Sequence, residues 1–158
     1  MNQDNEKLMR SIRLMRSFRR VQKNMMCLDQ QTAARNGLSM PQYAILMTLA
    51  KRQDMTQKTV GEVSFLPKST LSQAVDGLAR EGLLERQQVE DNRREMGLAL
   101  TAKGEALVHA IHSQQGGSHQ RFQEAVESLT DEQYEKLLEL HQHISAHLEI
   151  RDLEEQRR

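Results

Sequence analysis

The feature that most constrains this chain is a polar turn between two short segments with strand character. The turn is Asp91-Asn92-Arg93-Arg94, and the flanking segments are residues 84–89 and 96–100. Asp and Asn favour tight turns because their side chains hydrogen-bond to the local backbone. The sequence therefore predicts a β-hairpin with two arginines at its tip.

A short helix is predicted just before this hairpin, over residues 67–81, with Gly82 as its left-handed cap. Leu71, Val75 and Leu78 make its apolar stripe, and the opposite face has short polar groups: Ser69, Ser72, Gln73, Asp76 and Arg80. Such groups can approach a DNA groove closely and hydrogen-bond to phosphates and base edges. We expect Gln73 to contact adenine and Lys68 to contact guanine or phosphate. Asp76 would repel phosphate unless an arginine pairs with it.

A short helix followed by a basic hairpin is the arrangement of a winged helix. One helix enters the major groove, and the hairpin brings guanidinium groups to the neighbouring minor groove. The remaining helices are predicted over the first 35 residues, from Ser39, from Thr56, from Thr101 and from Thr130, with a break at Gly116-Gly117. The fold class is thus mainly α with a small β-hairpin wing.

The predicted first and last helices have long apolar faces that a small winged helix cannot bury. Mutual packing and packing against a second copy would cover them. We therefore expect three regions: an N-terminal dimerisation helix (1–36), a winged helix-turn-helix DNA-binding lobe (37–104) and C-terminal dimerisation helices (105–158). In a dimer, two recognition helices about one DNA turn apart would read an inverted repeat.

Composition sets limits on these expectations. The formal net charge is zero, so DNA affinity should depend on a few well-placed cations rather than on a broad basic surface. The sequence shows no signal peptide and no membrane-spanning apolar run, so we expect a soluble cytoplasmic protein. It has no Ser-His-Asp order, phosphate-binding glycine loop or dense carboxylate pair, which argues against an enzyme. No cofactor is expected.

Several motifs in the chain resemble the MarR family of bacterial transcription regulators. They are Leu38-Ser-Met-Pro-Gln-Tyr43, Thr56-Gln57 with Val60-Gly61, Lys68-Ser-Thr-Leu71, Leu78-Ala-Arg-Glu-Gly82-Leu-Leu-Glu-Arg86, Asp91-Asn-Arg-Arg94 and Leu100-Thr-Ala-Lys-Gly104. Their order and spacing carry the resemblance, which covers most of the chain. Gly61 departs from the family pattern, in which alanine is more usual.

The resemblance implies a homodimer that binds double-stranded DNA at a palindromic, often A/T-rich promoter site, most often as a repressor. It implies recognition-helix contacts from five residues: Lys68, Ser69, Thr70, Ser72 and Gln73. Arg93 and Arg94 would contact DNA from the wing, and Asp91 would brace the wing arginine. It also implies that a small lipophilic effector relieves DNA binding.

The effector class stays open at this point. A small-molecule pocket lined by Met15, Phe18, Met47 and Ile111 is one alternative, although those residues are equally ordinary core. Cys27, the single cysteine, is either a redox-sensing thiol or a small apolar residue. Peroxide-sensing relatives place their cysteine near the start of the first helix, whereas Cys27 comes later.

Metal sensing is a further alternative. Five side chains could supply ligands: His109, His112, Glu139, His143 and His147. Zinc-sensing relatives also take ligands from the second helix, where this chain has Tyr43 and Ala44, so we assign no metal site.

A different class of function would be a winged helix used for protein–protein contact, or a DNA binder without an effector. Neutral charge favours that interpretation slightly. Arg93 and Arg94 oppose it, because a protein-interaction module has no reason to place two arginines at the hairpin.

Overall fold

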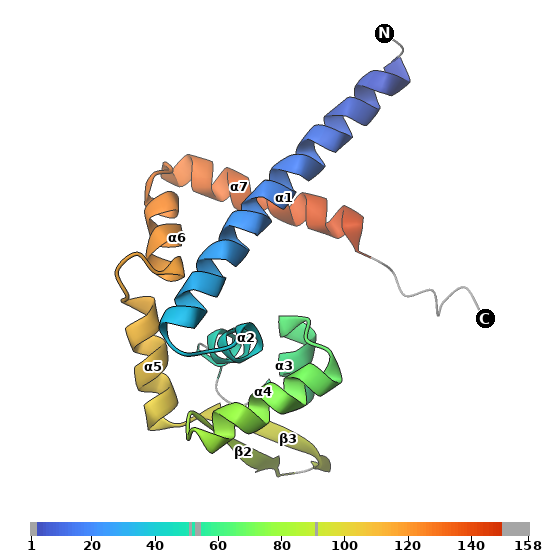
Figure 1. Cartoon of the computed structure of the whole chain (residues 1–158). Coiled ribbons are helices and arrows are strands. Elements are labelled where there is room, and N and C mark those ends of the chain that lie inside the picture. Colours follow the sequence, from blue (N-terminus) through green and yellow to red (C-terminus); the bar gives the residue numbers. More distant parts are fainter. Residues whose placement is uncertain (1–2, 51, 53–54, 91, 150–158) are drawn as a thin grey trace, which may run out of the picture. The chain divides into compact units, whose positions relative to one another are not determined.

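The computed structural model describes residues 3–50, 52, 55–90 and 92–149. The chain divides into two compact units, Met1–Gln120 and Arg121–Arg158 (Figure 1). The first unit contains α1 (Gln3–Arg35), α2 (Met40–Leu49), β1 (Met55–Thr56), α3 (Gln57–Ser64), α4 (Lys68–Arg80), β2 (Leu84–Val89), β3 (Asn92–Leu100) and α5 (Ala102–His112). α6 (Ser118–Glu127) starts in the first unit and ends in the second, which also contains α7 (Asp131–Leu148).

The first unit is a winged helix with a long helix before it. α2, α3 and α4 pack beside a three-stranded antiparallel sheet of order β1-β3-β2. Leu84 pairs with Leu100 at the start of the hairpin, and Met55 pairs with Leu98 on the other side of β3. The expected fold class, mainly α with a small β wing, is confirmed.

One hydrophobic core joins these elements. Its most deeply buried side chains come from α2, α3, α4, the sheet and α5: Ile45, Leu46, Val60, Val75, Leu78, Leu84, Leu98 and Ile111. Each large apolar side chain buried in this way stabilises the fold by about 1.5–3 kcal/mol. The core therefore holds α4 and the hairpin in a fixed relation to each other.

Helix starts follow the local sequence signals closely. The Ser39 hydroxyl accepts from the Gln42 backbone N–H, and the Gln42 side chain accepts from the Ser39 backbone N–H, which is a capping box. Thr130 and Gln133 form the same reciprocal pair at α7, as expected from the sequence. Thr56 caps α3 through the Thr59 N–H. Each such cap is worth about 1 kcal/mol.

The start of α5 is fastened to the end of α4. The Thr101 hydroxyl donates to the Gly82 carbonyl at 2.6 Å, and the Thr101 N–H donates to the Leu83 carbonyl at 3.2 Å. A Cβ at Gly104 would lie 1.9 Å from the Leu83 carbonyl oxygen. Only glycine permits this approach, so Gly104 sets how closely the start of α5 meets the backbone that follows α4.

Three elements differ from the sequence-based expectation. β1 was not predicted, since two residues are too few to show a period. β3 begins at Asn92 rather than at residue 96, so Arg93 and Arg94 belong to the strand and not to a free tip. After the break at Gly116 and Gly117, α6 forms a separate helix that the sequence did not single out.

Candidate nucleic-acid interface

The α4 helix separates a buried face from an exposed one. Leu71, Ala74, Val75 and Leu78 enter the core. A Cβ at Gly61 on α3 would come within 2.8 Å of the Leu71 side chain, so these two helices pack closely. The buried face thereby fixes which α4 residues point outward.

The five predicted recognition-helix residues all lie in the first half of α4. Lys68, Ser69 and Gln73 are exposed, whereas Thr70 and Ser72 are half-buried. Ser72 also lies 3.5 Å from the Gln57 side-chain nitrogen, which ties it to α3. The structure thus brings the predicted set together on one helix.

An ion pair within the lobe answers the question raised by Asp76. The Arg86 guanidinium, on β2, donates to the Asp76 carboxylate, and both side chains are partly exposed. The arginine offsets the charge of an acid on the exposed face of α4. Sequence reasoning missed Arg86, because nothing in its local pattern shows that the hairpin folds back beside α4.

The wing has an irregular register close to its turn. Val89 pairs with Asn92, but the preceding residue, Gln88, pairs with Met96. Between these two pairs, one step along β2 corresponds to four residues along β3. The additional residues of β3 include both predicted wing arginines. Such bulges redirect side chains and increase strand twist.

The predicted wing residues are described to different extents. Arg94 is exposed and takes part in an interaction within the chain. Arg93 belongs to β3, but its side chain lies outside the described part, as does the whole of Asp91.

A polar network connects the C-terminal part of α1 with α2 and the start of α6. The Tyr43 hydroxyl donates to Asp29 Oδ1 at 3.2 Å, and the Ser118 hydroxyl donates to the same oxygen. The Ser118 N–H donates to Thr32 Oγ1 at 2.9 Å. Burial, and then the nearby Asp29 charge, raise the pKa of Tyr43 to about 12. The network fixes the residues after the Gly116-Gly117 break against α1.

The four residues of the predicted ligand pocket do not lie close together within a single chain. Ile111 lies in the core and Met47 packs against it. Met15 and Phe18 lie on the exposed part of α1, roughly 22–27 Å along the helix from buried Ala33. One chain therefore does not form this pocket.

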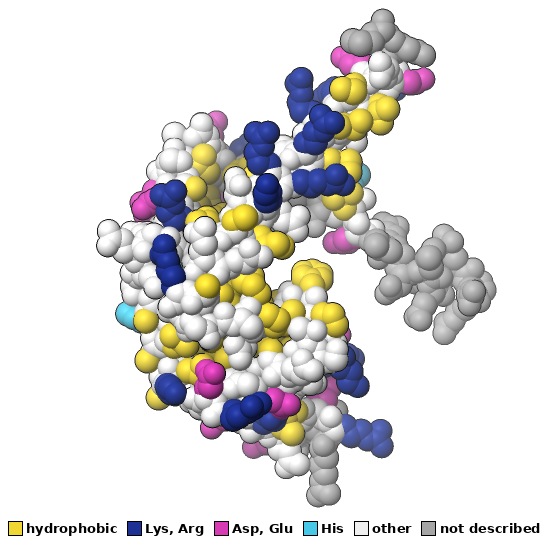
Figure 2. Space-filling model, in the orientation of Figure 1, with side chains coloured by type: hydrophobic (Ala, Val, Ile, Leu, Met, Phe, Trp, Pro, Cys, Tyr) yellow, Lys and Arg dark blue, Asp and Glu magenta, His cyan; other side chains and the backbone are white. Residues whose placement is uncertain are grey.

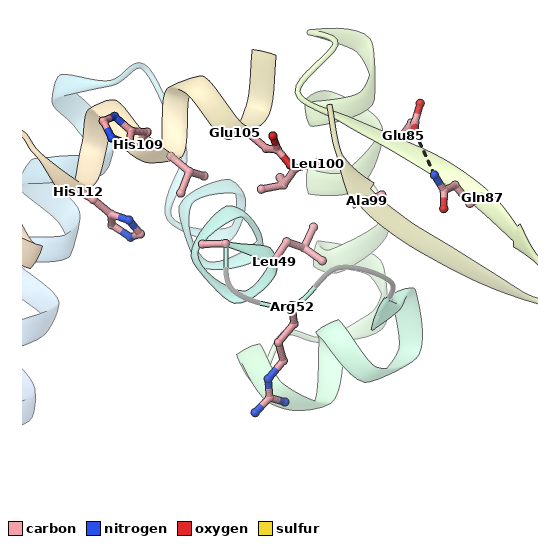
Figure 3. A pocket seen from close by; sticks show the side chains of 11 residues that line it. Leu49, Arg52, Glu85, Gln87, Ala99, Leu100, Glu105, His109 and His112 are labelled. Atoms are coloured by element: carbon pink, nitrogen blue, oxygen red, sulfur yellow. Dashed lines mark hydrogen bonds between the residues drawn. The ribbon is translucent and has the colours of Figure 1, made fainter. Parts of the chain in front are cut away.

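A different groove, of about 480 Å³, lies beside α5 and the end of α2 (Figure 3). Its floor is apolar and includes Leu49 and Leu100, while its rim has charged and polar groups: Arg52, Glu85, Gln87, Glu105, His109 and His112. On the rim, the Gln87 side chain donates to Glu85 at 3.0 Å. The groove could accept a small molecule with an apolar body and polar substituents.

The two other effector alternatives are metal sensing and thiol sensing. Among the described residues, no group of three or more His, Cys, Asp or Glu side chains is placed to hold a metal ion. The rings of His112 and His119 lie near each other with tilted planes and centroids 4.6 Å apart, as do those of His143 and His147. Cys27 is exposed on α1.

In the described part of the chain, no helix has the length and apolarity to cross a membrane.

Comparison with known proteins gives a consistent result. The MarR family model matches residues 36–95, which span the winged helix through the first part of β3. The chain is 26% identical to the HTH-type transcriptional repressor YetL of Bacillus subtilis over 132 residues, covering 82% of this chain and 77% of that protein. It is 30% identical over 70 residues to the organic hydroperoxide resistance transcriptional regulator of the same bacterium, covering 44% of this chain and 48% of that regulator.

Solved structures share the fold. The structure of reduced AbfR bound to DNA superposes with a TM-score of 0.66 at 19% identity, covering 92% of this chain and 98% of that one. The family model, the regulator relatives and the winged-helix architecture agree. Residues 36–95 thus form a winged helix of the MarR family of DNA-binding transcriptional regulators, whose members are not enzymes.

Proposed function

We propose that this regulator is a homodimeric repressor that reads an inverted DNA repeat and is released by a small-molecule effector. The observation that carries the proposal is the exposed first half of α4. Lys68, Ser69 and Gln73 project from a helix whose other face is locked in the core. Short polar side chains on a rigid helix suit hydrogen bonding to base edges in the major groove.

Wing contacts complete the proposed interface. Arg93 and Arg94 belong to the irregular segment of β3, and we propose that they contact a minor groove beside the site read by α4. A/T-rich DNA has a narrow minor groove with enhanced negative potential, which favours guanidinium groups there. Asp91, which lies outside the described residues, would brace the wing arginine.

The homodimer is supported by the exposed apolar surface of α1, which a second copy could bury. α1 buries only Thr32 and Ala33 among its 33 residues. Large apolar side chains are exposed along its length: Leu8, Met9, Leu14, Met15, Phe18, Val21, Met25 and Met26. Figure 2 shows hydrophobic patches on α1 between its basic side chains. Exposed apolar surface of this extent is typical of an interface between chains.

The second unit has the same need. No residue of α6 or α7, both described over their full lengths, is buried. The exposed large side chains include Phe122, Tyr134, Leu137 and Leu138. Short helices are marginal in water without tertiary packing. A second copy would cover α1 and α7 alike, in keeping with dimerisation regions at residues 1–36 and 105–158 around a DNA-binding lobe at 37–104.

Repression and its relief rest on the family and its relatives. YetL is named a transcriptional repressor. We propose a lipophilic effector that contacts Met15, Phe18, Met47 and Ile111, with the second copy completing the pocket. The groove in Figure 3 is the alternative place for it. The protein would act in the cytoplasm, where its DNA lies.

Thiol sensing is a second candidate for the signal, favoured by one observation. Cys27 is exposed on α1, and one relative is named for organic hydroperoxide resistance. Under this alternative, an organic hydroperoxide would release DNA from the wild type and not from Cys27→Ser. Equal behaviour of the two proteins would exclude thiol sensing.

The decisive experiment selects binding sites from random duplex DNA with the purified full-length protein. We expect an enriched inverted repeat whose half-sites are about one helical turn apart. Sedimentation of the complex should give two chains per duplex. The absence of enrichment from a folded dimer would contradict the proposal and favour a protein-interaction module. The enriched duplex then serves as the probe for an effector screen.

A further inference from the structure

Phe65 occupies a backbone position that normally requires glycine. It follows α3 with φ 55° and ψ 33°, in the left-handed region. The Phe65 N–H donates to the Glu62 carbonyl, and the Leu66 N–H donates to the Gly61 carbonyl at 3.1 Å. These two bonds define a Schellman motif, which places its left-handed residue at this position.

The described part of the chain builds this motif twice more, both times with glycine. Gly37 (φ 67°) follows α1, and Gly82 (φ 72°) follows α4. The Leu38 N–H bonds to the Ala33 carbonyl, and the Leu83 N–H bonds to the Leu78 carbonyl, in the same pattern. A bulky side chain at a left-handed position bears a steric penalty that glycine avoids. Phe65 is therefore the unfavourable choice for folding.

Packing does not compensate for this penalty. The Phe65 side chain is 92% exposed, whereas its neighbour Leu66 packs against the core. A large aromatic group is thus held in water on a strained backbone. Strain and exposure at one residue, next to a proposed binding helix, indicate a role in binding.

Phe65 lies at one edge of an open groove of about 950 Å³ between α3, the start of α4 and β3. Its apolar lining includes Leu66, Pro67 and Met96, of which Met96 is 40% exposed. Three cations also line the groove, Lys58, Lys68 and Arg94, together with two acids, Glu62 and Glu95. The groove is therefore lined by apolar side chains together with a small excess of positive charge.

We propose that this groove receives the sugar–phosphate backbone of the operator and that Phe65 and Met96 contact its deoxyribose carbons. The inference rests on the proposed placement of DNA against α4 and the wing. Lys68 belongs both to the groove and to the exposed face of α4, so the two surfaces are continuous.

The occupant follows from the groove's position and chemistry. α4 is directed to the major groove and the wing to the minor groove, so the strand that separates those two grooves must pass between them. That strand presents alternating phosphates and apolar sugar edges. The cations match the phosphates, and Phe65 with Met96 matches the sugars.

The test separates DNA affinity from stability, using the full-length protein and the selected duplex. Phe65→Gly and Phe65→Asn remove the ring and suit the left-handed backbone. Each should weaken binding about fivefold to tenfold, because roughly half the burial of one aromatic group is lost. Phe65→Gly should at the same time raise the melting temperature by about 2–4 °C. Phe65→Tyr keeps the ring and should bind as the wild type does.

Salt dependence distinguishes an apolar contact from a charged one. Loss of Phe65 should leave the slope of log affinity against log salt unchanged, whereas Lys68→Ala should reduce it by about one. Val63 serves as the matched control, since it is 47% exposed on α3 and is not among the groove residues. Val63→Ala should not alter affinity.

Each contrary outcome has a distinct meaning. Wild-type affinity in Phe65→Gly, with weakened binding in Lys68→Ala, would overturn this inference and leave the proposed DNA face intact. Unchanged affinity in both variants would overturn the proposed face itself. A changed salt slope in Phe65→Gly would make Phe65 a residue that positions Lys68. Uracil in place of thymine should have no effect; a loss confined to the wild type would assign the contact to a thymine methyl group and refute the sugar contact.

Discussion

The buried phenol of Tyr43 gives a quantitative prediction for stability against pH. Tyr43 is 6% exposed, and its hydroxyl donates to Asp29 at 3.2 Å. Burial first, and the Asp29 charge second, raise the pKa of Tyr43 from 10.0 to about 12. Below pH 10 the phenol is neutral in both the folded and the unfolded protein, so it adds no pH dependence there.

The sign follows from proton release on unfolding. Between pH 10 and 12 the unfolded phenol ionises while the folded one stays neutral, so the free energy of unfolding falls as pH rises. Two pKa units correspond to about 2.7 kcal/mol, reached as pH passes 12. Tyr43→Phe removes this term and also one hydrogen bond, which is worth about 1 kcal/mol.

Urea denaturation of both proteins from pH ~9 to pH ~12 tests the prediction. Tyr43→Phe should be the less stable protein at pH ~9 and the more stable one at pH ~12, with the two curves crossing between about pH 10.5 and 11. Tyr134→Phe is the control, because Tyr134 is 38% exposed and the two are the only tyrosines. Its curve should stay parallel to the wild-type curve. If the Tyr43→Phe curve also stayed parallel to the wild-type curve, the raised pKa of the buried Tyr43 phenol would be refuted.

A close helix contact, an ion pair and the recognition helix give three further expected outcomes. Gly104→Ala should lower the free energy of unfolding by about 3 kcal/mol, because its Cβ would meet the Leu83 backbone. Gly77→Ala is the control: its Cβ would meet only a flexible side chain, so in the same denaturation assay stability should change by less than about 1 kcal/mol, and equal effects of the two variants would contradict the reasoning. Arg86→Ala should weaken operator binding about fivefold in an anisotropy titration, because the Asp76 charge is then no longer neutralised. Adding Asp76→Asn to that variant should restore binding, and a loss that persists in the double variant would rule out the ion pair as the cause. Gln73→Ala should cost about 1–3 kcal/mol at one base position per half-site, while a uniform loss across sequences would make Gln73 a phosphate contact.

Helix boundaries were predictable because their signals are local. Thr56, Thr101 and Thr130 cap helices through backbone groups three residues further along, so both partners lie within one turn of sequence. Gly82 ends α4 as expected, since its left-handed backbone suits glycine. The exposed and buried faces of α4 followed equally from helical spacing. Such features need no knowledge of the rest of the fold.

Long-range pairs were not predictable for the opposite reason. Arg86 lies ten residues from Asp76, and Ser118 lies 89 residues from Asp29. No sequence period relates these partners, because the path of the chain between them decides whether they meet. Arg86 was therefore missed, although the need for an arginine beside Asp76 could be stated. Phe65 was missed for another reason, because its left-handed backbone appears only in the structure.

The charge arrangement of the lobe bears on how the protein finds its site. The Asp76–Arg86 pair cancels one arginine near α4, and Glu62 and Glu95 offset cations beside the groove. Non-specific DNA affinity comes almost entirely from neutralised phosphates and released counterions. Charge compensation of this kind implies weaker binding to random DNA. A larger share of the operator affinity is then expected from base contacts and apolar contacts, which respond less to salt than phosphate contacts do. A zero net charge is in this way compatible with a DNA-binding regulator, because it lowers affinity for competing sites more than affinity for the operator.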